Sequence, residues 1–267
     1  MKSEKAAKSA RINALKMVHN ANASHIASAL SIIDILAVLY EDILNISSSD
    51  FEHIDRDRFI LSKGHACVAV YSMLAEYGFF SKELLLEYGK NESILMHHIS
   101  HKVPGVEFST GSLGHGLPFG VGKALTAKLK KKDWRTYLLL GDGEMQEGSN
   151  WEALMFAAHH KLGNLLLIVD YNNQQSLTSV DDTLSLQPLD KKFSSFGWNV
   201  LNADGHDHKD LKKCMDAAKK IKSKPSVIIA KTTKGKGVSF MEDSVQWHYK
   251  PPNSKELAEA ISEIENA

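Results

Sequence analysis

The feature that most constrains this chain is a pair of apolar runs that each end on oxygen-bearing side chains. The first, Tyr137–Leu140, leads into Asp142 between two glycines, and the second, Leu165–Val169, leads into Asp170 and Asn172. Short apolar runs bounded by Gly, Asn and Asp predict buried strands that end in turns. In an open parallel sheet, ligands bind beyond the carboxyl ends of the strands. The two strand ends therefore predict one shared site with hard oxygen ligands.

Strand-like and helix-like segments alternate along the rest of the chain. Strands are expected over residues 59–61, 137–140, 165–169, 198–201 and 227–230. Helices are expected over residues 5–22, 30–44, 66–77, 211–221 and 255–264, and from residues 117 and 149 onward. Between them, residues 97–116 form a long loop with Pro104 and several glycines, and long ordered loops are often functional. This order predicts an α/β fold with a parallel sheet covered by helices on both faces. Since no linker or repeat is visible, residues 1–267 are expected to form a single domain.

Charge and composition restrict the partners. Lys+Arg and Asp+Glu both number 32, so the net charge is near zero, which argues against nucleic acid or an anionic membrane as the partner. The chain has only two cysteines, Cys67 and Cys214, far apart and in no metal or redox spacing. The N-terminus leads into no apolar signal core, and no apolar run approaches the ~20 residues of a membrane span. A soluble, cytoplasmic protein that associates with another protein is expected.

The pair of strand ends fits a divalent cation that carries a diphosphate. Magnesium prefers octahedral oxygen ligands and commonly keeps substrate phosphates among them. Asp142, Asn172 and a backbone carbonyl near Gln174 would leave positions for two phosphate oxygens and a water. A dinucleotide fold is the first alternative, but the turn after residue 140 lacks the G-x-G-x-x-G pattern, and its acidic residues would repel a pyrophosphate unless a cation intervened. The second alternative is an ordinary turn in which Asp142 caps the following helix.

These segments resemble a known family. Gly141-Asp-Gly143, followed about thirty residues later by Asn172-Asn173, resembles the signature of thiamine-diphosphate enzymes. Further segments are similar to transketolase, essentially along the whole chain and in order: Ser24-His25, Leu61-Ser-Lys-Gly-His65, Pro104-Gly-Val-Glu-Phe-Ser-Thr-Gly-Ser-Leu-Gly-His-Gly116, and Lys231-Thr-Thr-Lys-Gly-Lys-Gly237 with Trp247-His248.

The resemblance implies a thiamine-diphosphate-binding fold and a set of ligands for the cofactor. The implied cofactors are thiamine diphosphate and Mg²⁺, with Ca²⁺ or Mn²⁺ as substitutes. The implied metal ligands are Asp142, Asn172 and the carbonyl of Gln174. The implied cofactor-binding residues are His65, Gly111, Leu113, Gly143 and Asn172, with Glu147 in a carboxylate network between paired sites.

Four histidines match catalytic positions of the family. His25, His65 and His248 match histidines around the cofactor and the donor sugar. His97 matches a fourth by its spacing to Pro104, with His98 as the alternative, although the segment around both departs from the family pattern. Imidazole suits this role because it titrates near neutral pH, where protons move on sugar hydroxyls and on a cofactor-bound carbanion.

The resemblance extends only to the diphosphate-binding half of a transketolase, which is more than twice as long. It implies the N-terminal subunit of a split transketolase, expected in a two-plus-two heterotetramer with a C-terminal subunit that carries the pyrimidine-binding domain. The implied reaction transfers a two-carbon ketol unit from a ketose to an aldose, and the sugars, or sugar phosphates, are left open. Two alternatives remain, the alpha-type subunit of a 2-oxo-acid dehydrogenase and a non-catalytic cofactor-binding subunit.

Overall fold

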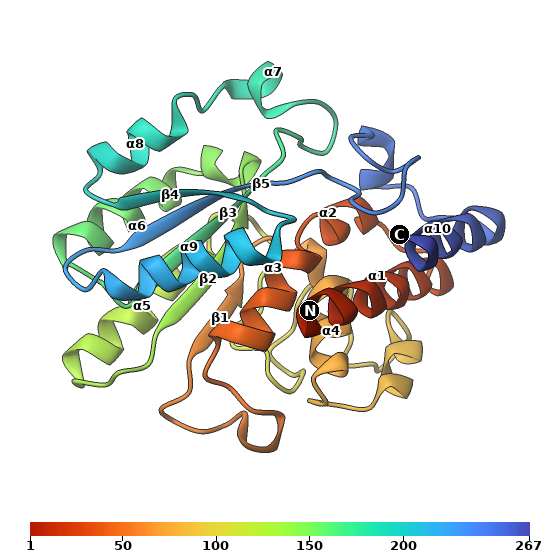
Figure 1. The fold of residues 1–267 in the computed structure, drawn as a ribbon, viewed down its shortest axis with the longest axis horizontal. Coiled ribbons are helices and arrows are strands. Elements are labelled where there is room, and N and C mark those ends of the chain that lie inside the picture. Colours follow the sequence, from red (N-terminus) through yellow and green to blue (C-terminus); the bar gives the residue numbers. More distant parts are fainter.

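The computed structural model describes residues 1–267 and has one five-stranded parallel sheet at its centre (Figure 1). The spatial order of the strands is β1-β2-β3-β5-β4, and every neighbouring pair is parallel. All five predicted strands are present, with ends shifted by no more than a few residues: β1 (Arg58–Leu61), β2 (Thr136–Gly141), β3 (Leu165–Tyr171), β4 (Asn199–Asp204) and β5 (Ser226–Lys231). Strands β2 and β3, which carry the predicted ligands, lie next to each other in this order.

Helices cover both faces of the sheet, as predicted, because successive side chains of a strand point to opposite faces. Leu139 and Ile168 belong to one buried core, and Leu138 and Leu167 belong to a second core on the other face. The first core takes in α1 (Lys2–Asn20), α2 (Ile26–Leu30), α3 (Ile33–Val38), α4 (Cys67–Glu76), α9 (His208–Lys220) and α10 (Ser254–Asn266). The second takes in α5 (Gly116–Leu129), α6 (Gly148–His159) and α8 (Leu189–Ser195).

Two parts of the helix prediction differ from the structure. The single helix expected over residues 30–44 is shorter and less regular: it consists of α3 followed by a π-helical turn, Leu39–Ile43, and a break separates it from the unexpected α2. The break falls at Ser31, whose hydroxyl donates to the carbonyl of Ser28 at 3.0 Å and to Asp170 at 2.7 Å. The polar residues between β3 and β4 also contain two short helices that were not expected, α7 (Val180–Leu184) and α8.

The remaining connections match the expected organisation. Residues 97–115 contain no helix or strand, and α5 begins at Gly116. The C-terminal helix α10 packs beside α1 (Figure 1). None of the helices combines the length and the apolar character that a membrane crossing requires.

Candidate functional site

A cavity of about 280 Å³ opens at the carboxyl edge of the sheet. Lys63 follows β1, Asp142 follows β2, Asn172 follows β3 and Lys234 follows β5, and all four line this cavity. A parallel sheet brings these residues together because all its strands end at the same edge. Only two of the 19 lining residues are hydrophobic, so the cavity suits a polar or charged ligand.

Asp142 and Asn172 lie against each other at the floor of the cavity. One oxygen of Asp142 accepts the backbone N–H groups of Asn172 at 3.0 Å and Asn173 at 2.5 Å, and the other accepts the N–H of Gly143 at 2.8 Å. The side-chain oxygen of Asn172 accepts the N–H of Gln174 at 3.0 Å. Asp142 also caps the short 3₁₀ helix Gly143–Gln146, as the alternative of an ordinary capped turn predicts. It does not cap the following α-helix, α6, which begins only at Gly148. Both side chains retain lone pairs beyond these bonds.

The charges at the floor favour a cation near Asp142. Burial, together with the negative charge of nearby Asp170, raises the pKa of Asp142 to about 6, although hydrogen bonds from Asn173 and Gly143 oppose the rise. Burial alone would also raise the pKa of Asp170. Its ion pair with Lys63 at 2.6 Å, and hydrogen bonds from side chains including that of Thr232, outweigh burial and hold its pKa below the usual value. Asp142 has no such partner, so a bound cation would stabilise its ionised form.

Three of the predicted histidines form a cluster above this floor. The ring centroid of His25 lies 5.1 Å from that of His65 and 5.0 Å from that of His248. The position of His25 requires a left-handed backbone, with φ of 74°, and its N–H donates to the carbonyl of His248 at 2.7 Å. Burial, with the nearby positive charge of Lys234, lowers the pKa of His248 to about 3. Burial, followed by His98 and the lysines, lowers the pKa of His25 to about 4, and the pKa of His65 is also well below its usual value for the same main reason. The three rings are therefore neutral at pH 7.

Of the two histidines considered for the fourth position, only His98 reaches the cavity. His98 lines the cavity, with its ring 6.1 Å from that of His25. His97 does not line it and lies against Tyr88, at 5.2 Å between ring centroids. Residues 97 and 98 lie in a bend of the loop, and their side chains point in different directions, so the spacing to Pro104 does not distinguish them.

The other predicted cofactor-binding residues divide into two groups. Gly111, Leu113 and Gly143 line the cavity. Glu147 is exposed and does not line it. Gln174 lines it and has an unpartnered, buried side-chain oxygen besides its backbone carbonyl.

Besides Lys63 and Asp170, two more charged residues line the cavity without having been predicted as site residues. Glu144 is buried and accepts the hydroxyl of Ser62 at 2.5 Å and the N–H of Gly114 at 3.0 Å, so it ties the long loop to the end of β2. Lys234 is only 2% exposed, and its ammonium donates to the carbonyl of Gln175 at 2.8 Å. The signal for Glu144 was its place beside the strand end. Nothing in the spacing around Lys234 indicates that its side chain points inward.

Comparison with known proteins identifies the family. Residues 2–264 match the model described as the thiamine diphosphate binding domain of transketolase. The chain belongs to the transketolase family. It is the N-terminal, thiamine-diphosphate-binding part of such an enzyme, a transferase, which confirms the predicted family, fold and type of enzyme. The dehydrogenase alternative is not favoured.

The similar transketolases include separate subunits as well as longer chains. The chain is 40% identical to a subunit of the apulose-4-phosphate transketolase of Phocaeicola vulgatus, over 94% of this chain and 89% of that protein. It is 35% identical to the 6-deoxy-6-sulfo-D-fructose transketolase subunit SqwG of Clostridium sp., over 94% and 92%. The crystal structure of transketolase from Campylobacter jejuni superposes with a TM-score of 0.92 at 34% identity, over 98% of this chain but only 42% of that one. The similarity to proteins of matching length supports an N-terminal transketolase subunit.

Proposed function

We propose that this transketolase-family chain binds thiamine diphosphate through a divalent cation and transfers a two-carbon ketol unit together with a C-terminal subunit. The observation that carries the proposal is the meeting of Asp142 and Asn172, at 3.0 Å between carboxylate oxygen and backbone nitrogen, in a polar cavity. The substrates proposed are a ketose donor and an aldose acceptor, as sugars or sugar phosphates. The chain is proposed to act as one domain, because one sheet runs through it.

The donor set fits Mg²⁺, or Ca²⁺ or Mn²⁺ in its place. A carboxylate, an amide oxygen and a backbone carbonyl are hard oxygen ligands, and Asp142, Asn172 and Gln174 supply one of each. The raised pKa of Asp142 supports the fit, because a cation would offset both its burial and the charge of Asp170. Gly111 and Gly141 have almost nothing within 4 Å of where a Cβ would lie, so the backbone there is open to a close-lying diphosphate.

The histidines are proposed to handle protons on the substrate. When bound, thiamine diphosphate supplies the electron sink that stabilises a carbanion. His25 and His65 are neutral in the cavity, so each ring has one nitrogen that can accept a proton or a hydrogen bond from a sugar hydroxyl. His248 is also neutral, but its Nδ1 faces the Lys234 ammonium at 3.1 Å and must accept, so its Nε2 carries the proton and can donate to a sugar oxygen. His98 is proposed as the fourth member in place of His97, since His98 alone of the two lines the cavity.

A C-terminal subunit is proposed as the partner, in a heterotetramer of two copies of each subunit. The relatives of matching length are named as subunits, which supports a separate partner. On the surface of α6, adjacent Met155 and Phe156 are 55% and 44% exposed, and exposed apolar side chains of this size favour a protein contact. Glu147 is exposed beside the start of α6, which suits the proposed role between paired sites. The two cysteines are free and buried, which fits a reducing compartment such as the cytoplasm.

The test is calorimetry of the complex with its partner, titrated with thiamine diphosphate in the presence and absence of Mg²⁺. Asp142→Asn keeps the shape of the side chain but removes its charge, and should weaken Mg²⁺-dependent binding by about 100-fold, as expected when a buried charge loses its partner. Asp133→Asn is the matched control, because Asp133 is exposed and outside the cavity, and it should bind like the wild type.

Turnover distinguishes the remaining candidates. Formation of a new ketose from a ketose and an aldose supports the proposal. Cofactor binding without ketol transfer by the complete complex would leave the non-catalytic alternative, and no Mg²⁺-dependent binding at all would overturn the proposed site.

A further inference from the structure

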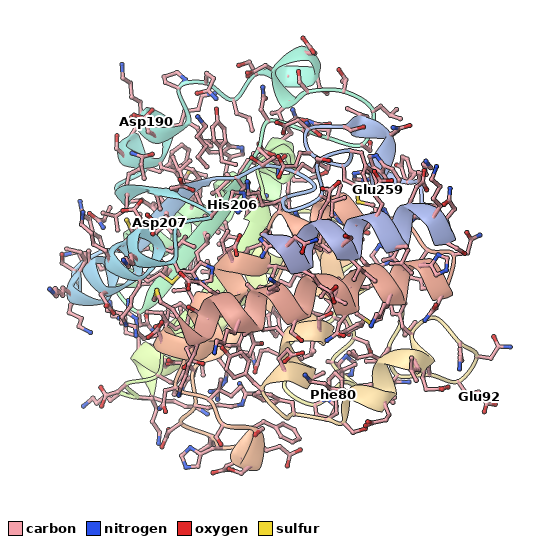
Figure 2. The ribbon with its side chains drawn as sticks, turned by 45° about the vertical axis from the view of Figure 1, so that its right-hand side comes forward. Phe80, Glu92, Asp190, His206, Asp207 and Glu259 are labelled. Carbon is pink, nitrogen blue, oxygen red and sulfur yellow. The ribbon has the colours of Figure 1, made fainter.

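A second cluster of ionisable side chains lies outside the cavity, around Asp34 of α3. One oxygen of Asp34 accepts hydrogen bonds from Arg11 at 2.5 Å and from His206 at 2.8 Å, and the other contacts His208 at 3.0 Å. Burial would raise the pKa of Asp34, but these three partners together hold it well below the usual value. The cluster joins α1, α3, the loop between β4 and α9, and the start of α9, where His208 lies. His206, in that loop, is labelled near the centre of Figure 2.

The bonds of His206 fix its tautomer. Its Nε2 lies 2.8 Å from the backbone nitrogen of Thr233, which can only donate, so Nε2 must accept. The proton of the neutral ring is therefore on Nδ1, from which it is donated to Asp34. His208 contacts the same carboxylate, but its other nitrogen pairs with the hydroxyl of Ser3. Two members of the cluster contact the segment after β5: His206 at the N–H of Thr233, and Arg11 at the carbonyl of Lys236, to which its Nε donates at 3.3 Å. Of the two, only His206 contacts the residue next to Lys234.

That segment delivers a charged side chain to the cofactor cavity. Thr233 precedes Lys234, whose ammonium contacts Nδ1 of His248 at 3.1 Å and the carbonyl of Gln174, a proposed metal ligand, at 3.5 Å. On either side, the segment is held by the N–H of Thr232, which donates to the carbonyl of Tyr171, and by the N–H of Gly235, which donates to that of Ala27. The N–H of Thr233 lies between these two backbone hydrogen bonds, and its own acceptor is the side chain of His206.

We propose that His206 is a positioning residue for the cofactor site. Held by Asp34, its ring accepts the N–H of Thr233 and so fixes the backbone from which Lys234 reaches into the cavity. Loss of that acceptor would free the Thr233 peptide to rotate, and the ammonium would lose its place beside His248 and the Gln174 carbonyl. This inference rests on the proposed function for its effect on the cofactor, although the effect on the backbone is independent of it.

The test uses two substitutions, each of which can replace one of the two hydrogen bonds made by the His206 ring. In His206→Gln the amide oxygen can replace Nε2 and accept from Thr233, whereas in His206→Asn the shorter amide can replace Nδ1 and donate to Asp34 but cannot reach Thr233. His208→Asn is the control, because it disturbs the same carboxylate without touching the segment after β5. Hydrogen exchange of the peptide covering residues 231–238 is measured on the full chain, and the dissociation constant for thiamine diphosphate with Mg²⁺ on the complex with its partner.

We expect His206→Asn to accelerate exchange of that peptide about tenfold and to weaken cofactor affinity by about three- to tenfold, consistent with the loss of one buried hydrogen bond. His206→Gln and His208→Asn should stay within about twofold of the wild type in both measurements. Equal effects of His206→Asn and His208→Asn on exchange and on cofactor affinity would overturn the proposal, because the cluster would then only stabilise the packing of the helices. Fast exchange in His206→Gln would also overturn it. If the wild-type complex binds no cofactor, the proposed function fails, but the exchange data still decide whether His206 holds the segment.

Discussion

Removal of the Lys63 ammonium should leave a buried negative charge without its partner. Lys63 is 4% exposed and Asp170 is fully buried, and both residues of this ion pair of 2.6 Å line the cavity. Lys63→Met retains most of the side-chain volume and removes the charge. The carboxylate of Asp170 would still accept from Ser31, Thr232 and Asn172, but no cation would remain in contact with it.

The loss in folding free energy expected for Lys63→Met lies at the lower end of the range for removal of one partner of a buried ion pair. Removal of one partner of such a pair typically costs about 3–5 kcal/mol, because the other charge stays buried. Since three hydrogen bonds to Asp170 survive, we expect about 3 kcal/mol for Lys63→Met. For a chain of this size, about 2 °C of melting temperature corresponds to 1 kcal/mol, which predicts a decrease of about 6 °C.

Differential scanning calorimetry of the full chain measures the decrease in melting temperature, and a double-mutant cycle isolates the contribution of the ion pair between Lys63 and Asp170. Asp170→Asn combined with Lys63→Met removes both charges, so the double variant should be about 2 kcal/mol more stable than Lys63→Met alone. Lys90→Met is the matched control, because Lys90 pairs with Glu87 on the surface at 3.0 Å, and exposed pairs contribute little. A decrease below about 1 kcal/mol for Lys63→Met, or a double variant less stable than Lys63→Met, would refute the reasoning.

Three further predictions concern backbone contact, packing and pH. Gly64→Ala should destabilise the chain by more than about 2 kcal/mol in a urea titration, because a Cβ would lie 2.3 Å from the carbonyl oxygen of Thr110; an unchanged midpoint would contradict this. Leu154→Ala should cost about 2–5 kcal/mol in the same assay, since Leu154 is fully buried in the second core, and a loss under 1 kcal/mol would show that the core closes around the gap. The folded-state pKa values of His25 and His248 are lowered to about 4 and about 3, which together outweighs the rise of the pKa of Asp142 to about 6. The unfolded chain therefore binds more protons between about pH 4 and 6.5, and stability should fall as pH decreases through that window. Melting temperatures that rise on acidification across it would contradict the lowered values.

The sheet could be predicted from the sequence because apolar content and turn residues decide local structure directly. Five apolar runs bounded by turn residues marked the five strands, and their alternation with helices indicated the parallel arrangement. The same pattern placed Asp142 and Asn172 at one edge, since that inference needs only strand direction and adjacency.

Features that depend on long-range contacts were not predictable in this way. The break after α2 lies at Ser31, whose hydroxyl bonds to Asp170, a residue far away in sequence. The choice between His97 and His98 depends on the path of the loop backbone, which spacing does not specify. Lys234 was not assigned a role because its burial results from the segment after β5 folding back over the strand ends.

The close packing of His25, His65 and His248 limits how many of these rings can be protonated at the same time. With ring centroids 5.0 Å apart for His25 and His248, two charged rings would repel each other by about 3 kcal/mol at an effective dielectric constant near 20. That exceeds two pKa units, so once one ring is charged the others resist protonation and the group titrates as a coupled unit. The three rings can therefore hold at most one extra proton between them. Under the proposed function, a proton accepted from one ligand would have to leave before the next could be accepted, which would impose an order on successive transfers.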